Sequence, residues 1–125
     1  MYLVCPASKR FWFDRLIPYD NPTGHLYDHA SLAALAGLCV RHDAWLVSDE
    51  AYRELYYREG PPVSAWGLTA AEVPGIAGRR ISIETVSKVW NACGLRIGAL
   101  ITDNAEFHRR AVAEVDLVLQ DLKHP

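Results

Sequence analysis

The sequence predicts an α/β domain, in which helices lie on the faces of a mostly parallel sheet. Three observations support this fold class. The short, continuous apolar run AWLVS at 44–48 is typical of a parallel strand that is covered on both faces. Apolar runs of this kind alternate with segments of helical spacing, as they do in parallel sheets. A polar, turn-rich segment follows each of three apolar runs, as is expected where parallel strands end beside a ligand.

The first half of the chain is expected to form a strand, a helix and a second strand. RLIPYD at 15–20 is the first expected strand, and it ends in the turn sequence NPTG at 21–24. A helix is expected next, with Asp28 as its N-cap. Its apolar face consists of Leu32, Leu35, Ala36 and Cys39. The run at 44–48 is the second strand.

The second half is expected to form a long connection, two strands and a helix. The prolines and glycines of residues 58–79 predict a connection with at most a short helical piece around Ala70. RISIE at 80–84 and RIGALIT at 96–102 are the expected strands, and a helix is expected from 104 to about 120. The apolar face of that helix consists of Phe107, Ala111, Val115 and Val118.

Composition favours one globular domain and excludes several partners. The chain has 125 residues, half of them hydrophobic, with a formal charge of −2. No basic run suggests nucleic acid as a partner, and no apolar run approaches the roughly 20 residues that span a bilayer. The three cysteines and five histidines lack the spacing of a disulfide framework or a metal site, so no metal is expected. These features together predict a cytoplasmic protein without nucleic-acid or membrane partners.

The three polar segments are expected to converge on one edge of the sheet. They are NPTG at 21–24, SDEAY at 48–52 and ETVSK at 84–88. Each has an ordinary structural interpretation when it is taken alone: a turn, a helix cap and a surface lysine. The charged side chains of Glu50, Arg53 and Glu54 are interpreted as a solvated turn.

These segments combine into a pattern that resembles a known family. NPTG, D-x-x-Y from Asp49 to Tyr52, T-x-S-K at 85–88 and G-L-R-I-G at 94–98 closely resemble the central part of the fold-type I, class I/II aminotransferases that use pyridoxal phosphate. The resemblance extends from about Leu16 to Arg110. It implies that residues 1–125 are a partial cofactor-binding (large) domain. It also implies amino transfer between an amino acid and a 2-oxo acid, and a homodimer.

The resemblance also implies a role for each residue of the motifs. Lys88 would form the Schiff base with the cofactor aldehyde and then transfer the substrate proton. Asp49 would face the pyridine nitrogen and keep it protonated. Tyr52 and Asn21 would hydrogen-bond the phenolic oxygen of the cofactor ring, and Asn21 would also lie near the substrate carboxylate.

The remaining motif residues would hold the cofactor phosphate. Arg96 would do so with Thr85 and Ser87, because a planar guanidinium offers paired donors to an anion. Thr85 stands where many relatives have serine, a departure that keeps the hydroxyl group.

Two alternatives to amino transfer stay open at this point. The motifs bind the cofactor without choosing which bond breaks, so lyase or decarboxylase chemistry of the same fold is one alternative. The other is a non-catalytic remnant or interaction module. It arises because the N-terminal part that stacks on the cofactor and the C-terminal small domain, with its carboxylate-binding arginine, are expected to be absent from this sequence.

Overall fold

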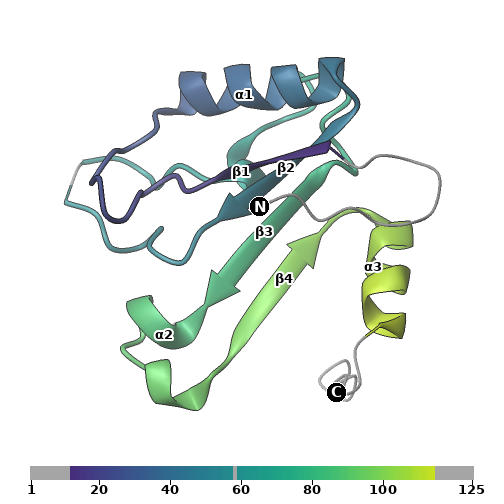
Figure 1. Cartoon of the computed structure of the whole chain (residues 1–125). Coiled ribbons are helices and arrows are strands. Elements are labelled where there is room, and N and C mark those ends of the chain that lie inside the picture. The colour runs from purple at the N-terminus through teal and green to yellow at the C-terminus, as the bar shows by residue number, and fades with distance from the viewer. Residues whose placement is uncertain (1–11, 58, 115–125) are drawn as a thin grey trace.

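A four-stranded sheet forms the centre of the molecule (Figure 1). The computed structural model describes residues 12–57 and 59–114. In spatial order the strands are β1 (Trp12–Leu16), β2 (Ala44–Asp49), β3 (Arg80–Thr85) and β4 (Gly98–Thr102). The first three are mutually parallel, and β4 runs antiparallel to β3. The expected mostly parallel α/β sheet is therefore confirmed.

The described residues also form three α-helices and two short 3-10 helices, of which α3 follows the last strand and the others lie between strands. They are α1 (His29–Arg41), α2 (Val86–Val89) and α3 (Ala105–Ala113), with η1 (Ala65–Gly67) and η2 (Cys93–Leu95). Asp28 caps α1 as expected, because its carboxylate accepts a hydrogen bond from the Ser31 backbone N–H at 2.7 Å. Within the described ranges, no helix is long and apolar enough to cross a membrane.

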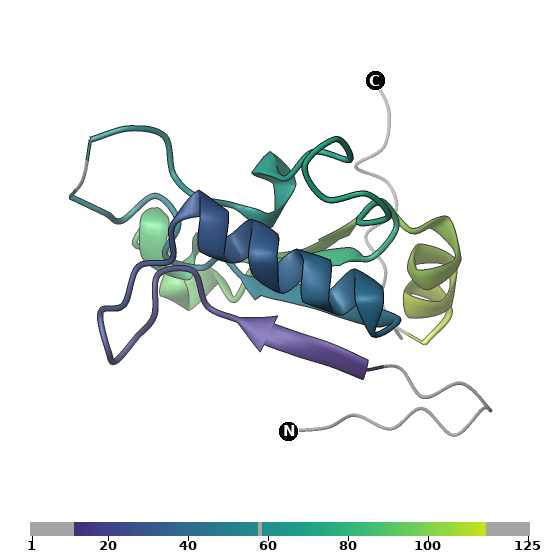
Figure 2. The same cartoon turned by 90° about the horizontal axis from the view of Figure 1, so that it is seen from above.

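The hydrophobic core lies between α1 and one face of the sheet. Figure 2 shows α1 crossing in front of the strands when the molecule is seen from above. Alternate residues of β2 point toward the helix, and burial alternates along the strand accordingly. The buried apolar residues of this core come from α1, the strands and the long connection: Leu16, Leu32, Ala36, Cys39, Ala44, Leu46, Ala65, Leu68, Val73 and Ile76.

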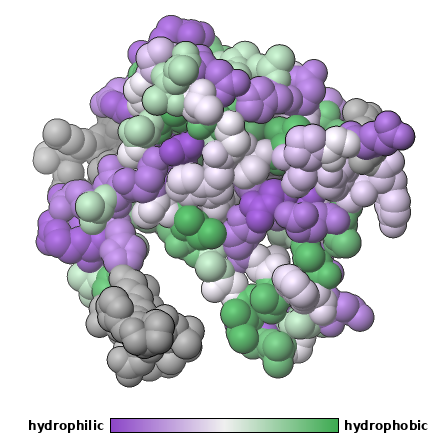
Figure 3. Space-filling view, turned by 180° about the vertical axis from the view of Figure 1, so that it is seen from behind, coloured by the Kyte–Doolittle hydropathy of each residue, from purple (hydrophilic) through white to green (hydrophobic). Residues whose placement is uncertain are grey.

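The opposite face of the sheet is only partly covered. α3 packs there, and the ring of Phe107 lies 5.4 Å from the ring of Trp45, measured between centroids. Toward β4 the apolar side chains are exposed, at 37% for Ile83 and 53% for Leu100. Figure 3, the view from behind, shows hydrophobic residues at the surface in the middle and lower part of the molecule. An apolar surface of this kind is typical of a sheet that packs against further protein.

The first strand ends earlier than the sequence suggested. It spans Trp12–Leu16 rather than 15–20. Pro18 has no backbone N–H to donate to a sheet, and the chain turns away from β2 after Leu16. Tyr19 instead forms an isolated bridge with Leu26.

Two later boundaries also differ from the expectation. β4 begins at Gly98 rather than Arg96, because Arg96 has a left-handed backbone conformation (φ 54°) that ends η2. In the long connection the short helix is η1 rather than a piece around Ala70, where the chain forms a turn. Val115, Val118 and the expected end of the last helix lie outside the described residues.

Candidate functional site

The three polar segments meet where the parallel strands end. Parallel strands present their carboxyl ends at one edge of a sheet, so residues that follow β1, β2 and β3 lie there together. The Asn21 side-chain amide donates a hydrogen bond to the Tyr52 hydroxyl at 3.0 Å. The Lys88 ammonium lies 5.7 Å from the centre of the Tyr52 ring, within the range of a cation–π contact. Asn21, Tyr52 and Lys88, which are far apart in sequence, therefore form one group.

A single helical turn, α2, carries Lys88. Thr85 is its N-cap, and the threonine Oγ1 accepts a hydrogen bond from the Ser87 backbone N–H at 3.1 Å. The same hydroxyl lies 2.9 Å from the Ser87 Oγ. The cap therefore fixes both hydroxyl groups beside the exposed Lys88 side chain.

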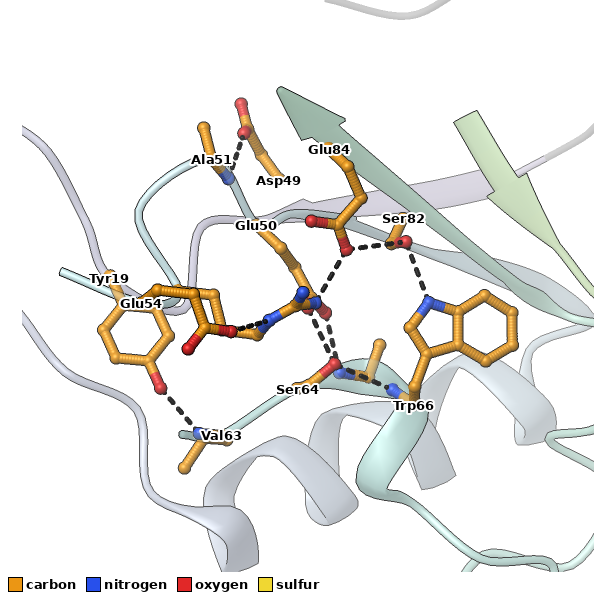
Figure 4. Close-up of polar contacts among 12 residues, drawn as sticks. Tyr19, Asp49, Glu50, Ala51, Glu54, Val63, Ser64, Trp66, Ser82 and Glu84 are labelled. Carbon is orange, nitrogen blue, oxygen red and sulfur yellow. Dashed lines mark hydrogen bonds and ion pairs between the residues drawn. The ribbon is translucent and has the colours of Figure 1, made fainter. Parts of the chain in front are cut away.

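Asp49 is the last residue of β2 and is paired in register with Ile83. Because side chains alternate along a strand, its half-buried carboxylate lies on the face opposite Ser48 and Glu50. Figure 4 shows it on the far side of the backbone from the Glu50 carboxylate. One carboxylate oxygen accepts a hydrogen bond from the Ala51 backbone N–H at 3.3 Å.

Arg96 lies in the loop that follows η2, and its guanidinium contacts that loop. Its Nη1 donates to the Cys93 carbonyl at 3.1 Å, and the side chain is exposed. Thr85 Oγ1 donates to the Ile97 carbonyl at 3.2 Å. This bond joins the Arg96 loop to the beginning of α2.

Gly98 allows this loop to approach β3 closely. A Cβ at position 98 would lie 2.9 Å from the Glu84 carbonyl oxygen, which is a backbone atom that moves only with its strand. We therefore expect Gly98→Ala to destabilise the fold by about 1–3 kcal/mol, measured by urea denaturation. Gly94→Ala is the matched control, because nothing lies within 4 Å of a Cβ at that position. Equal stability of the two variants would contradict the close approach.

Sequence reasoning missed a second polar cluster beside these segments. Glu50, which was expected in a solvated turn, is only 1% exposed. Its carboxylate accepts hydrogen bonds from the Ser64 hydroxyl at 2.7 Å and the Ala65 backbone N–H at 2.8 Å, and it pairs with Arg53 (Figure 4). The alternation of buried and half-buried side chains along β2 could have indicated this burial. Glu50 lies two residues after the buried Ser48, so its side chain falls on the same, buried face.

Arg53 connects three carboxylates in this cluster. Its guanidinium pairs with Glu50, with Glu54 at 3.0 Å and with Glu84 at 2.7 Å. Burial by itself lowers the pKa of Arg53, but the hydrogen bonds to these carboxylates outweigh it and raise the pKa above its usual value. An open pocket of about 440 Å³ lies against the cluster and also contacts Thr85 at the start of α2.

Comparison with known proteins relates these motifs to one family. The family profile described as "Aminotransferase class I and II" matches residues 19–123. The arginine–pyruvate transaminase AruH of Pseudomonas aeruginosa is 38% identical over 81 residues, which are 65% of this chain and 19% of that protein. Kynurenine–oxoglutarate transaminase 1 of Rattus norvegicus is 33% identical over 94 residues, or 74% of this chain and 21% of that protein.

Solved structures agree with this relation. N-succinyldiaminopimelate aminotransferase of Mycobacterium tuberculosis superposes with a TM-score of 0.67 at 28% identity, over 83% of this chain and 26% of that chain. The PLP-bound C-S lyase of Staphylococcus hominis superposes with a TM-score of 0.71 at 22% identity, over 86% of this chain and 26% of that chain, and it shares the fold. The chain thus spans about a fifth of the length of the curated relatives it matches.

Proposed function

Because the chain belongs to the class I and II aminotransferase family, we propose that it is the lysine-bearing part of a pyridoxal-phosphate enzyme that transfers an amino group between an amino acid and a 2-oxo acid. The observation that carries this proposal is the meeting of Asn21, Tyr52 and Lys88 at the carboxyl edge of the sheet. In parallel α/β sheets this edge is where ligands bind.

The side chains at this edge fit pyridoxal phosphate, which is an anionic, aromatic aldehyde. The exposed Lys88 supplies an amine for the aldehyde, and Thr85 and Ser87 supply hydroxyl groups fixed at the start of a helical turn. Arg96 supplies a cation on a loop that is hydrogen-bonded to Thr85. When bound, the cofactor supplies an electron sink for the breaking of a bond at the substrate carbon.

Each residue has a distinct task in this proposal. Lys88 would hold the cofactor covalently through its amine and would take and return the proton at the substrate carbon. Asp49 holds a proton at the pyridine nitrogen. Tyr52 and Asn21 orient the ring through its phenolic oxygen, and Asn21 also binds the substrate carboxylate. Arg96, Thr85 and Ser87 bind the phosphate by charge-assisted hydrogen bonds.

Asp49→Asn tests this assignment of roles. The amide keeps the size of the side chain and removes its charge, so the proton at the pyridine nitrogen is no longer held. We expect amino transfer to fall by roughly 100-fold, the usual effect of removing one preorganised electrostatic group. Attachment of pyridoxal phosphate to Lys88 should persist. Chromatography of the product measures the rate of transfer between an amino acid and a 2-oxo acid. An unchanged rate in Asp49→Asn would refute the role of Asp49.

A non-catalytic role, as a remnant or interaction module that keeps the lysine motif, is the alternative. It assumes that residues 1–125 represent a partial large domain, without the part that stacks on the cofactor and without the small domain. Amino transfer by the 125-residue chain above that of Lys88→Ala would eliminate this alternative. Release of ammonia and a cleaved side-chain group, without amination of the 2-oxo acid acceptor, would indicate lyase chemistry.

We also propose a homodimer and a cytoplasmic location. The exposed apolar residues Leu95, Ile97 and Leu100 support self-association, and sedimentation velocity tests it. Cys93 is an exposed free thiol, as is common in a reducing compartment, and cell fractionation tests the location.

A further inference from the structure

We propose that Arg53 is a positioning residue, which fixes Tyr52 relative to Lys88 by joining the turn after β2 to the end of β3. This inference rests on the proposed function, because the distance between Tyr52 and Lys88 matters only if both contact one cofactor. Neither Arg53 nor its carboxylate partners belong to the group that is proposed to contact the cofactor.

The position of Arg53 in the chain makes such a link possible. Arg53 directly follows Tyr52, and Glu84 directly precedes Thr85, the cap of the helical turn that carries Lys88. The guanidinium Nη1 lies 2.7 Å from the Glu84 carboxylate. The pair therefore joins the two segments within one residue of Tyr52 and at the beginning of the lysine turn.

The backbone does not provide this link by itself. The Glu50 N–H donates to the Ile83 carbonyl at 3.0 Å. Among the described residues beyond this point, no further backbone hydrogen bond joins the turn after β2 to the segment after β3. The ion pair between Arg53 and Glu84 continues the connection where the sheet ends.

The ion pair between Arg53 and Glu84 is more buried than a surface ion pair, and its side chains have further partners. The side chains of Arg53 and Glu84 are 24% and 20% exposed, so solvent screens them only in part. Arg53 is also held by the fully buried carboxylate of Glu50, and the Ser82 hydroxyl lies 3.4 Å from the Glu84 carboxylate. Both ends of the link are therefore fixed in position.

Two variants that each remove one carboxylate from Arg53 separate positioning from general stability. Glu84→Ala breaks the link between the segments. Glu54→Ala is the matched control, because Glu54 lies next to Arg53 in the same turn and cannot join two segments. The first readout needs no cofactor: the nuclear Overhauser effect between the Tyr52 ring protons and the Lys88 side chain should weaken in Glu84→Ala and stay in Glu54→Ala.

The second readout is the rate at which pyridoxal phosphate and borohydride label Lys88. We expect the rate at saturating cofactor to fall roughly tenfold in Glu84→Ala, because small displacements of reacting groups slow reactions strongly. The half-saturating concentration should stay constant, since the phosphate-binding residues are intact. If Glu84→Ala does not fold, Glu84→Gln replaces it, since it keeps the shape of the side chain, and a smaller loss in both readouts is expected.

An unchanged Overhauser effect in the folded Glu84 variant would overturn the inference, and so would equal effects of Glu84→Ala and Glu54→Ala. Absence of any labelling in the unsubstituted chain would overturn the proposed function instead. Because the Overhauser effect is measured without cofactor, these two failures are distinguishable.

Discussion

Lys88→Arg is expected to abolish the covalent attachment of pyridoxal phosphate to the chain. Arginine keeps a positive charge at position 88, but its guanidinium stays protonated in proteins and does not condense with an aldehyde. After incubation with the cofactor and reduction by borohydride, the unsubstituted chain should gain the mass of one reduced cofactor on the peptide that contains Lys88. Lys88→Arg should gain none.

The other lysines of the sequence provide the control for this experiment. Lys9 and Lys123 are amines that can react with any free aldehyde, but neither belongs to the motifs at the edge of the sheet. Lys9→Arg and Lys123→Arg should therefore be labelled as fully as the unsubstituted chain. Label that moves to one of these lysines, or that persists in Lys88→Arg, would show that Lys88 has no special reactivity.

The order of the elements could be predicted from the sequence because burial leaves a periodic pattern. The run at 44–48 indicated a covered parallel strand, and Asp28 indicated the beginning of a helix, and both expectations are confirmed. The predicted end of the first strand was wrong, because the apolar run continues to Pro18 although the chain leaves the sheet after Leu16. The direction of β4 follows from a tertiary pairing that local sequence does not encode.

The candidate site was predictable as a set of segments and not as a set of contacts. The convergence of 21–24, 48–52 and 84–88 follows from the parallel order of three strands, which the sequence indicates. The orientation of Arg96 toward its own loop, and the ion pair between Arg53 and Glu84, depend on side-chain geometry across segments. A charged residue after a strand is usually solvated, and this general rule led to the wrong expectation for Glu50.

Glu50→Ala is expected to be among the most destabilising single substitutions in the described part of the chain. The Glu50 side chain is fully buried and neutralises Arg53, and its carboxylate accepts hydrogen bonds from Ser64 and from the Ala65 backbone N–H. The substitution leaves that N–H and a partly buried guanidinium without this acceptor. Each buried donor that loses its acceptor usually costs about 1–3 kcal/mol, and Arg53 keeps its pairs with Glu54 and Glu84.

Urea denaturation, followed by tryptophan fluorescence, measures this loss as a lower unfolding midpoint at an unchanged slope. Glu54→Ala is the control, because its carboxylate contacts the same arginine but is 49% exposed, and exposed pairs contribute less than about 1 kcal/mol. A similar midpoint for both variants would mean that the Glu50 cluster contributes little. A large difference would mean that Glu50 fastens the long connection at Ser64 and Ala65 to the edge of the sheet where Tyr52 and Lys88 meet.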